Sequence, residues 1–296
     1  MRKQILFCAA LLLLSILSSV SVVAQDVIPQ PNNISYSKGY FTLNKGLKAV
    51  TNLTGQDFKV LNQFTSDDMD MPLISMKKPS KAYNVRLICT GTALQATQAQ
   101  DSARLQGYEL EVSPKSITIQ SLTPTGLFYG LLTLAQLEKG RQIPCVKVKD
   151  TPRFPYRGLM IDCSRHFWTK KFIMKQLDAM AYFKLNRFHW HLTDGGGWRM
   201  EVKQYPRLTN ETAYRTQSDW VKWWMEKDRK YCPVGTPGAY GGYYTQQDIK
   251  DIVRYAAARH ITVIPEIEMP GHSDEVVYAY PELSCTGKPY TQSDLC

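Results

Sequence analysis

From residue 158 onward, short apolar runs alternate with longer amphipathic ones, and this alternation limits the possible folds more than any other feature. The apolar runs have the length and composition of β-strands, and they are residues 158–162, 187–192 and 261–268. Between them lie helical patterns that Thr169 and Thr245 can cap, the second with Asp248 in the capping-box position. Repeated strand–helix units predict a parallel sheet with helices outside. Two closures fit: an open doubly wound sheet, or a (β/α)₈ barrel.

Polar side chains at the predicted strand ends favour the barrel. Residues that could do chemistry follow each of the three strands, and in barrels such residues gather at the carboxyl ends of several strands. No glycine-rich phosphate loop follows the first strand, which counts against a dinucleotide-binding fold. The candidates are Asp162, Arg165, His166, His189, His191, Asp194, Glu266, Glu268 and His272.

The first half of the chain has a different pattern. Residues 107–112 and 116–120 alternate apolar and polar side chains around a turn at Pro114 and Lys115, which predicts a β-hairpin. Residues 126–137 form a mostly apolar stretch and predict a buried helix. We therefore expect a small α+β domain at residues 26–150, followed by a proline-rich seam and a barrel domain at residues 151–296.

The extreme N-terminus has the features of a secretory signal peptide at residues 1–24. Arg2 and Lys3 form a charged segment, residues 5–14 are apolar, and Val22 and Ala24 precede a cleavage point before Gln25. Serines interrupt the apolar run before it reaches the length of a transmembrane helix. We expect an exported protein, periplasmic, on the cell surface or extracellular, with no membrane span after cleavage.

Charge and cysteine content narrow the possible partners and sites. The net charge of +10 suits anionic surfaces or polymers. The basic residues are scattered and no nucleic-acid motif occurs, so no nucleic-acid partner is expected. No two cysteines have C-x-x-C spacing, which counts against a zinc site of that type. Cys285 and Cys296 bracket a loop, and both a disulfide and two free thiols fit.

Several site hypotheses remain open at the level of single residues. His189 and His191 share one face of a strand, and Asp194 and His272 could add ligands to a metal site. Alternatively, Asp194 orients His272, which then supports a catalytic acid; a structural pair beneath the site fits equally well. Arg165 suits the adjacent hydroxyls of a sugar, although a surface ion pair is the ordinary role of an arginine.

Asp274 and Glu275 form an adjacent acidic pair, but they open a predicted helix at residues 273–280, where the helix dipole favours carboxylates. A structural role is therefore expected for both. Residues 220–244 read as a long aromatic loop, and long loops favour function.

Four stretches of this sequence resemble the β-N-acetylhexosaminidases of glycoside hydrolase family 20. They are R-G-L-M-I-D-C-S-R-H-F at 157–167, N-R-F-H-W-H-L-T-D at 186–194 with G-W-R at 197–199, G-G-Y-Y-T-Q-Q-D-I at 241–249, and H-I-T-V-I-P-E-I-E-M-P-G-H at 260–272. The first half resembles the small N-terminal α+β domain of that family, notably in G-Y-E-L-E-V and T-P-T-G-L-F-Y-G-L-L-T-L.

The resemblance implies hydrolysis of terminal, non-reducing β-linked N-acetylhexosamine in glycans, with retention and assistance from the acetamide of the substrate. An Asp-Glu pair orients that acetamide and protonates the leaving oxygen. By position, Arg165 would bind the sugar hydroxyls, and Asp194 and His272 would form a relay behind the acid. The resemblance implies no metal and no cofactor.

The sequence departs from the family pattern at two places. The family's Asp-Glu pair follows a G-G dipeptide at the end of the fourth barrel strand, a position beyond Cys296, and Gly195 and Gly196 stand where the family usually has acidic or polar residues. We therefore expect the N-terminal portion of such an enzyme, with about three βα units of the barrel, that is inactive by itself. A non-catalytic N-acetylhexosamine-binding or scaffold protein is the alternative, and a hydrolase that uses Glu266 and Glu268 as its acids is a third hypothesis.

Overall fold

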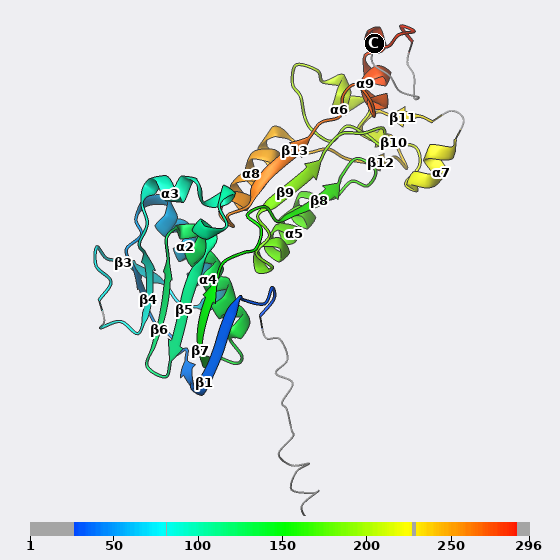
Figure 1. Cartoon of the computed structure of the whole chain (residues 1–296). Helices are drawn as coiled ribbons and strands as arrows, with labels where there is room; N and C mark the ends of the chain where they lie inside the picture. The colour runs from blue at the N-terminus through cyan, green and yellow to red at the C-terminus, as the bar shows by residue number, and fades with distance from the viewer. Residues whose placement is uncertain (1–26, 81, 227–228, 289–296) are drawn as a thin grey trace, which may run out of the picture.

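The computed structural model describes residues 27–80, 82–226 and 229–288. It contains a seven-stranded mixed sheet, followed along the chain by a three-stranded parallel sheet and a second, small three-stranded sheet. Figure 1 shows the seven-stranded sheet at one end of an elongated molecule, the three-stranded parallel sheet in the middle and the small sheet toward the other end. The predicted signal peptide, residues 1–24, lies outside the described residues.

The seven strands lie in the order β1-β7-β5-β6-β4-β2-β3. β5 and β6 form the predicted hairpin, with Ser113 paired to Ser116 at the turn. Strands β1, β7, β5 and β6 are antiparallel neighbours, and β6, β4, β2 and β3 are parallel. The bounds are β1 (Asn33–Thr42), β2 (Ala49–Thr51), β3 (Leu73–Ser75), β4 (Val85–Cys89), β5 (Tyr108–Ser113), β6 (Ser116–Ser121) and β7 (Gln142–Asp150).

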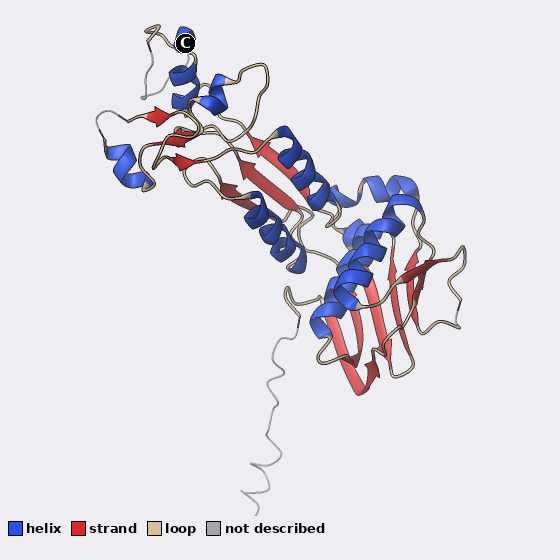
Figure 2. Ribbon diagram, turned by 180° about the vertical axis from the view of Figure 1, so that it is seen from behind, coloured by secondary structure: helices blue, strands red, loops and turns tan. Residues whose placement is uncertain are grey.

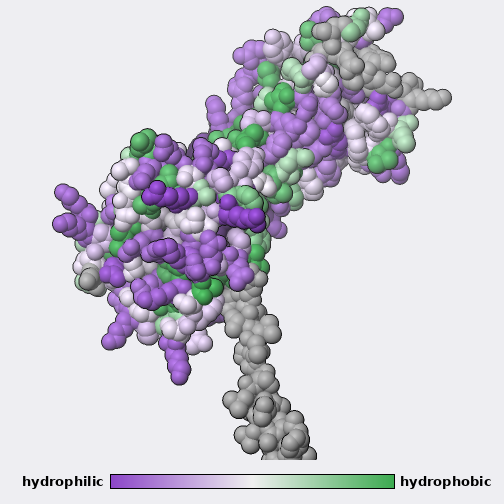
Figure 3. Space-filling model, viewed as in Figure 1, coloured by the Kyte–Doolittle hydropathy of each residue, from purple (hydrophilic) through white to green (hydrophobic). Residues whose placement is uncertain are grey.

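Helices cover one face of this sheet and leave the other open (Figure 2). On the open face, Lys149 pairs with Glu109 at 2.8 Å and Lys147 pairs with Glu111 at 3.0 Å. Figure 3 shows mostly hydrophilic side chains across this part of the molecule. The helices and 3₁₀ turns of the first half are α2 (Gly55–Met69), α3 (Ala93–Thr97), α4 (Pro124–Leu137), η1 (Ala99–Asp101) and η2 (Arg104–Gln106).

α4 is buried on nearly every side, as its apolar sequence predicts. Thr123 caps it by accepting a hydrogen bond from the Gly126 N–H at 3.2 Å. One face of the helix packs on the sheet, and the other meets the second half of the chain. There Lys184 Nζ lies 2.7 Å from Thr133 Oγ1, and Gln136 donates to the Tyr182 carbonyl at 2.8 Å. α4 therefore joins the two halves into one continuous core.

The second half begins with three parallel strands in the order β13-β9-β8 and two helices outside them. These are β8 (Gly158–Asp162), β9 (Arg187–His191), β13 (Thr262–Glu266), α5 (Lys170–Tyr182) and α8 (Gln246–Ala257). Thr169 and Thr245 cap the helices as predicted, and Asp248 completes the capping box. This is the first part of a (β/α)₈ barrel, so the predicted fold class is confirmed.

The long loop predicted at residues 220–244 contains regular structure that we did not predict. The small sheet has the order β11-β10-β12. Arg215, which belongs to β10, and Arg199 are both fully buried. Arg199 donates to the carbonyls of Cys163 and Ser164, and Arg215 to that of Gly196. The remaining elements of the second half, inside and outside this loop, are α6 (Arg207–Asn210), β10 (Tyr214–Arg215), α7 (Trp220–Met225), β11 (Tyr231–Cys232), β12 (Tyr240–Gly241), α9 (Asp274–Ala279) and η3 (Pro281–Leu283).

The structure gives the state of five cysteines and bears on the question of a membrane span. Cys285 is disulfide-bonded. Cys296, the partner that the sequence suggests for it, lies outside the described residues. Four other cysteines are free thiols: Cys89, Cys145, Cys163 and Cys232. Among the described residues, no helix combines the length and the apolar character that crossing a bilayer requires.

Candidate active site

The carboxyl ends of the three barrel strands place candidate side chains at one level. His191 on β9 is in register with Asp162 on β8 and with Glu266 on β13. The loops that leave these strand ends carry Arg165 and Asp194 and, after β13, His272. Parallel strands therefore gather residues that are far apart in the sequence, as the barrel prediction requires.

Arg165 is held between two carboxylates from different strand ends. Its Nη1 lies 2.9 Å from Asp162 Oδ2, and its Nη2 lies 2.5 Å from Asp194 Oδ2. The guanidinium also lies 5.8 Å from the centre of the Trp220 ring. The loop itself is tied to β8, because Asp162 Oδ1 accepts from the backbone N–H groups of Ser164 and Arg165 at 2.9 and 3.0 Å. The guanidinium is thus fixed while its side chain remains 28% exposed.

Asp194 is the centre of the site. Its side chain is only 4% exposed and contacts three cationic or ionisable partners: Arg165, His272 Nδ1 at 3.3 Å, and His191 Nε2 at 3.4 Å. The backbone N–H of Gly195 also donates to Asp194 Oδ1 at 2.7 Å. Burial alone would raise the pKa of Asp194, but the hydrogen bond from His191 and the charges of Arg165 and His272 outweigh it and lower the pKa. Asp194 is therefore an ionised anchor at neutral pH.

His272 reaches Asp194 from the loop after β13. Its side chain is 64% exposed, and Nδ1 is the ring nitrogen that faces the carboxylate. A carboxylate that accepts from Nδ1 fixes the tautomer and leaves Nε2 to act on a group that approaches from solvent. The structure therefore brings Arg165, Asp194 and His272 together. The direct contact between Arg165 and Asp194 was not predicted.

A second cluster lies beside Asp194. His189 Nε2 and His191 Nδ1 both face Glu266 Oε2, the latter at 3.6 Å. The interaction with Glu268 lowers the pKa of Glu266, and the same interaction raises the pKa of Glu268. The hypothetical metal site of His189, His191, Asp194 and His272 does not form as one group, because Asp194 and His272 pair with each other and with Arg165.

Asp274 and Glu275 open α9 as predicted, and both are buried. Asp274 Oδ2 lies 3.9 Å from Arg229 Nη1. Burial raises the pKa of Glu275 well above its usual value, and the charges of Asp194 and Asp274 add to this effect. Neither residue reaches Arg165 or His272 by a hydrogen bond or ion pair within the described part of the chain. The structure therefore gives no support to a catalytic role for the pair.

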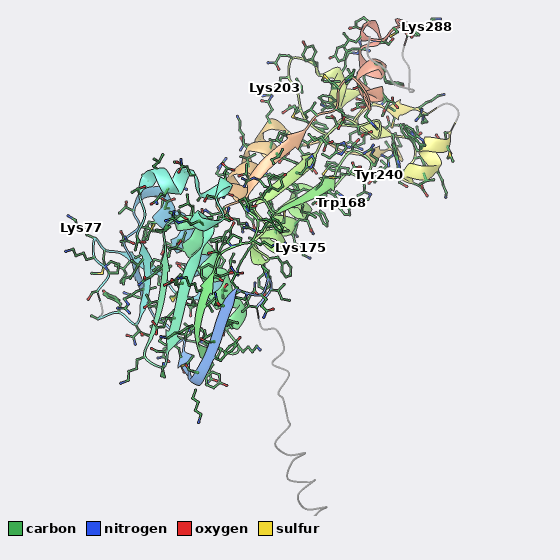
Figure 4. All side chains as sticks on the ribbon, in the orientation of Figure 1. Lys77, Trp168, Lys175, Lys203, Tyr240 and Lys288 are labelled. Atoms are coloured by element: carbon green, nitrogen blue, oxygen red, sulfur yellow. The ribbon has the colours of Figure 1, made fainter. Side chains whose placement is uncertain are left out.

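Sequence reasoning missed the residues that support the Asp194 loop. Tyr231 donates its hydroxyl to the Gly195 carbonyl at 2.7 Å, and Ser164 Oγ donates to the Asp194 carbonyl at 2.8 Å. At the rim, Trp168 and Tyr240 flank His166, with Tyr240 Oη 2.8 Å from His166 Nδ1. Figure 4 labels Trp168 and Tyr240 in this half of the molecule. The two adjacent glycines after Asp194 were the only signal available, because such a pair suggests close backbone packing.

Two sequence models of one family match almost the whole described chain. Residues 24–151 match glycosyl hydrolase family 20, domain 2, and residues 154–295 match the catalytic domain of that family. A β-hexosaminidase of Porphyromonas gingivalis is 36% identical over 277 residues, which cover 88% of this chain and 32% of the relative. The N,N'-diacetylchitobiase of Vibrio harveyi is 35% identical, with 86% of this chain and 28% of the relative covered.

Solved structures agree with this assignment. The exo-β-N-acetylglucosaminidase of Vibrio harveyi in complex with N-acetylglucosamine superposes with a TM-score of 0.69 at 32% identity, over 88% of this chain and 38% of that one. The β-N-acetylhexosaminidase of Bacteroides fragilis gives 0.71 at 27% identity, over 92% and 50%. This chain thus spans about a third to a half of the proteins compared here. The chain belongs to family 20 of the glycosyl hydrolases, and it comprises domain 2 and the first part of the catalytic barrel.

Proposed function

We propose that the whole protein hydrolyses terminal, non-reducing β-linked N-acetylhexosamine residues of glycans with retention of configuration. The observation that carries this proposal is the contact of Arg165, Asp194 and His272, which come from three successive strand ends. Family membership supports it, as do relatives named for β-hexosaminidase and chitobiase activity.

The geometry suits each residue to a role. Each terminal nitrogen of Arg165 has one N–H committed to a carboxylate, so a second N–H on each is left for adjacent sugar hydroxyls. Asp194 holds both that guanidinium and the His272 ring, so the sugar clamp and the proton relay share one anchor. His272 would then support the acid that protonates the leaving oxygen.

The resemblance supplies the rest of the reaction. The acetamide oxygen of the substrate attacks the anomeric carbon while the glycosidic oxygen takes a proton from the Glu of the Asp-Glu pair. Water then opens the cyclic intermediate and returns a proton to that Glu. The G-G-D-E motif of the family does not occur in these 296 residues. We therefore expect no turnover from this stretch alone, whereas the whole protein should be active.

The test uses the whole protein with 4-nitrophenyl N-acetyl-β-D-glucosaminide and, as a matched control, the β-D-glucoside that lacks the acetamide. Turnover of the first substrate alone is expected. Asp194→Asn should lower kcat/KM by about 100-fold or more, because the clamp and the relay lose their common charge. Asp178→Asn, at an exposed carboxylate on α5, is the control variant. Equal turnover of both substrates, or an unaffected Asp194→Asn enzyme, would contradict the proposal. If the whole protein binds N-acetylglucosamine without cleaving either substrate, the non-catalytic alternative applies.

We also propose that the protein is exported. The support is the charged, apolar and small-residue order of residues 1–24. N-terminal sequencing of the mature protein from its native host is expected to begin at Gln25. A mature chain that begins at Met1 in the soluble cell interior would reject export.

A further inference from the structure

Four metal-ligating side chains converge beside Asp194, where the proposed reaction assigns them no role. They are His189 and His191 on β9, Glu266 at the end of β13, and Glu268 two residues later. Ligand atoms of His191, Glu266 and Glu268 all lie within 4.8 Å of one another. His189 joins them because its Nε2 contacts Glu266 Oε2. Three of the four residues lie on two adjacent strands, and Glu268 lies in the loop directly after β13.

One ring nitrogen of His191 is bonded to the protein backbone, and the other faces this group. Its Nε2 lies 3.0 Å from the Thr193 carbonyl oxygen, which can only accept, so Nε2 carries the hydrogen. Nδ1 faces Glu266 Oε2 at 3.6 Å. That oxygen is buried and makes no hydrogen bond of normal geometry within the described chain. A cation bound between His191 Nδ1 and Glu266 Oε2 would take the place of a ring proton there.

Distances and donor types select the class of cation. Zinc binds imidazole nitrogen and carboxylate oxygen at about 2.0–2.2 Å in tetrahedral geometry, so two of its ligands are roughly 3.4 Å apart. The 3.6 Å separation of His191 Nδ1 and Glu266 Oε2 is close to that value. Mixed imidazole and carboxylate donors favour transition metals over magnesium and calcium.

The surroundings of His191 also match those of a metal ligand. Ligating histidines commonly donate their second N–H to a carbonyl or carboxylate, which orients the ring. Here Thr193 O and Asp194 Oδ2, the latter at 3.4 Å, surround Nε2 in that way.

We propose that His189, His191, Glu266 and Glu268 form a binding site for a divalent transition-metal ion of the zinc type. The site is separate from the chemistry of the proposed hydrolysis, which needs no metal. A metal bound there would lie next to Asp194, so its charge would act on the carboxylate that holds Arg165 and His272.

The test uses the whole protein with its affinity tag removed and its metal removed by a chelator. Calorimetric titration with zinc chloride should show one equivalent bound, and cobalt(II) should develop the visible absorption bands of a tetrahedral site. Magnesium chloride in excess should not compete. His189→Asn and Glu268→Gln should each weaken zinc binding by about 10-fold or more.

His166→Asn, a histidine at the rim of the same face but outside the group, is the matched control and should bind zinc normally. Thermal unfolding of each metal-free variant shows whether it remains folded. Binding of well under one equivalent by the parent protein would overturn the proposal. So would an equal loss in His166→Asn, or full binding by both folded ligand variants. None of these measurements depends on glycosidase activity, so failure here leaves the proposed function untouched.

Discussion

Gly196 shows at the scale of single residues how tightly the Asp194 loop is packed against the loop that carries Arg165. A Cβ atom on Gly196 would lie 2.8 Å from both the Arg165 Cα and the Ser164 carbonyl oxygen, which are backbone atoms that cannot move alone. A Cβ on Gly195 would lie 3.0 Å from Asp274 Oδ2, the end of a side chain. The departure from the family pattern at these two positions therefore has a steric reason at Gly196 and a weaker one at Gly195.

Gly196→Ala should displace Arg165 from the two carboxylates that hold it. We expect the free energy of unfolding to fall by roughly 1–3 kcal/mol, as for other overpacked sites, together with a marked loss of kcat/KM. Urea unfolding and the glucosaminide assay on the whole protein measure the two effects. Gly195→Ala is the matched control, and its losses should be distinctly smaller. Equal effects of the two substitutions would show that the backbone contact at Gly196 is not the limiting one.

Among the elements, local signals predicted the parts whose partners are near in the sequence or whose ends carry caps. β8 was predicted at its observed bounds, and Thr169 and Thr245 marked the starts of α5 and α8. The β5–β6 hairpin followed from alternation around a turn. β1 was not predicted, because most of its side chains are exposed and it pairs with β7, more than 90 residues away.

The small sheet could not have been predicted from periodicity, since its strands are two residues long. Its stability depends on Arg199 and Arg215, whose partners are backbone carbonyls remote in the sequence. The same limit applies to the site. The alignment of strand ends was predictable from the barrel, but the ion pair of Arg165 and Asp194 depends on how two loops pack.

For the whole molecule, the interface between the two halves predicts a dependence of stability on pH. His260 lies there partly buried, with its Nδ1 3.1 Å from Thr125 Oγ1 and its ring 5.0 Å from that of Phe128. Burial lowers the pKa of His260 to about 4. Below the unfolded value near 6.5, the unfolded chain binds a proton that the folded chain does not. Stability should therefore fall as the pH drops from about 6.5 to about 4.

The free energy of unfolding should fall by about 3 kcal/mol in all over this pH range. His260→Asn suits the left-handed backbone at this position, where φ is 55°. The variant should be less stable at neutral pH, because it loses packing against Phe128, but the part of the acid slope due to His260 should disappear. Urea unfolding between pH 7 and about pH 4 measures the slope. A His260→Asn protein with an unchanged slope would refute the assignment.

The burial of α4 has a consequence for biosynthesis. The helix is synthesised before any part of the barrel. The face that contacts Lys184 and His260 in the folded protein therefore stays uncovered while translation continues. A nascent chain that has left the ribosome only as far as β7 presents this apolar face to the surroundings, where chaperones bind such surfaces. The first half should therefore depend on the second half for solubility. Because both halves belong to one chain, the segment that covers this face of α4 is synthesised directly after it.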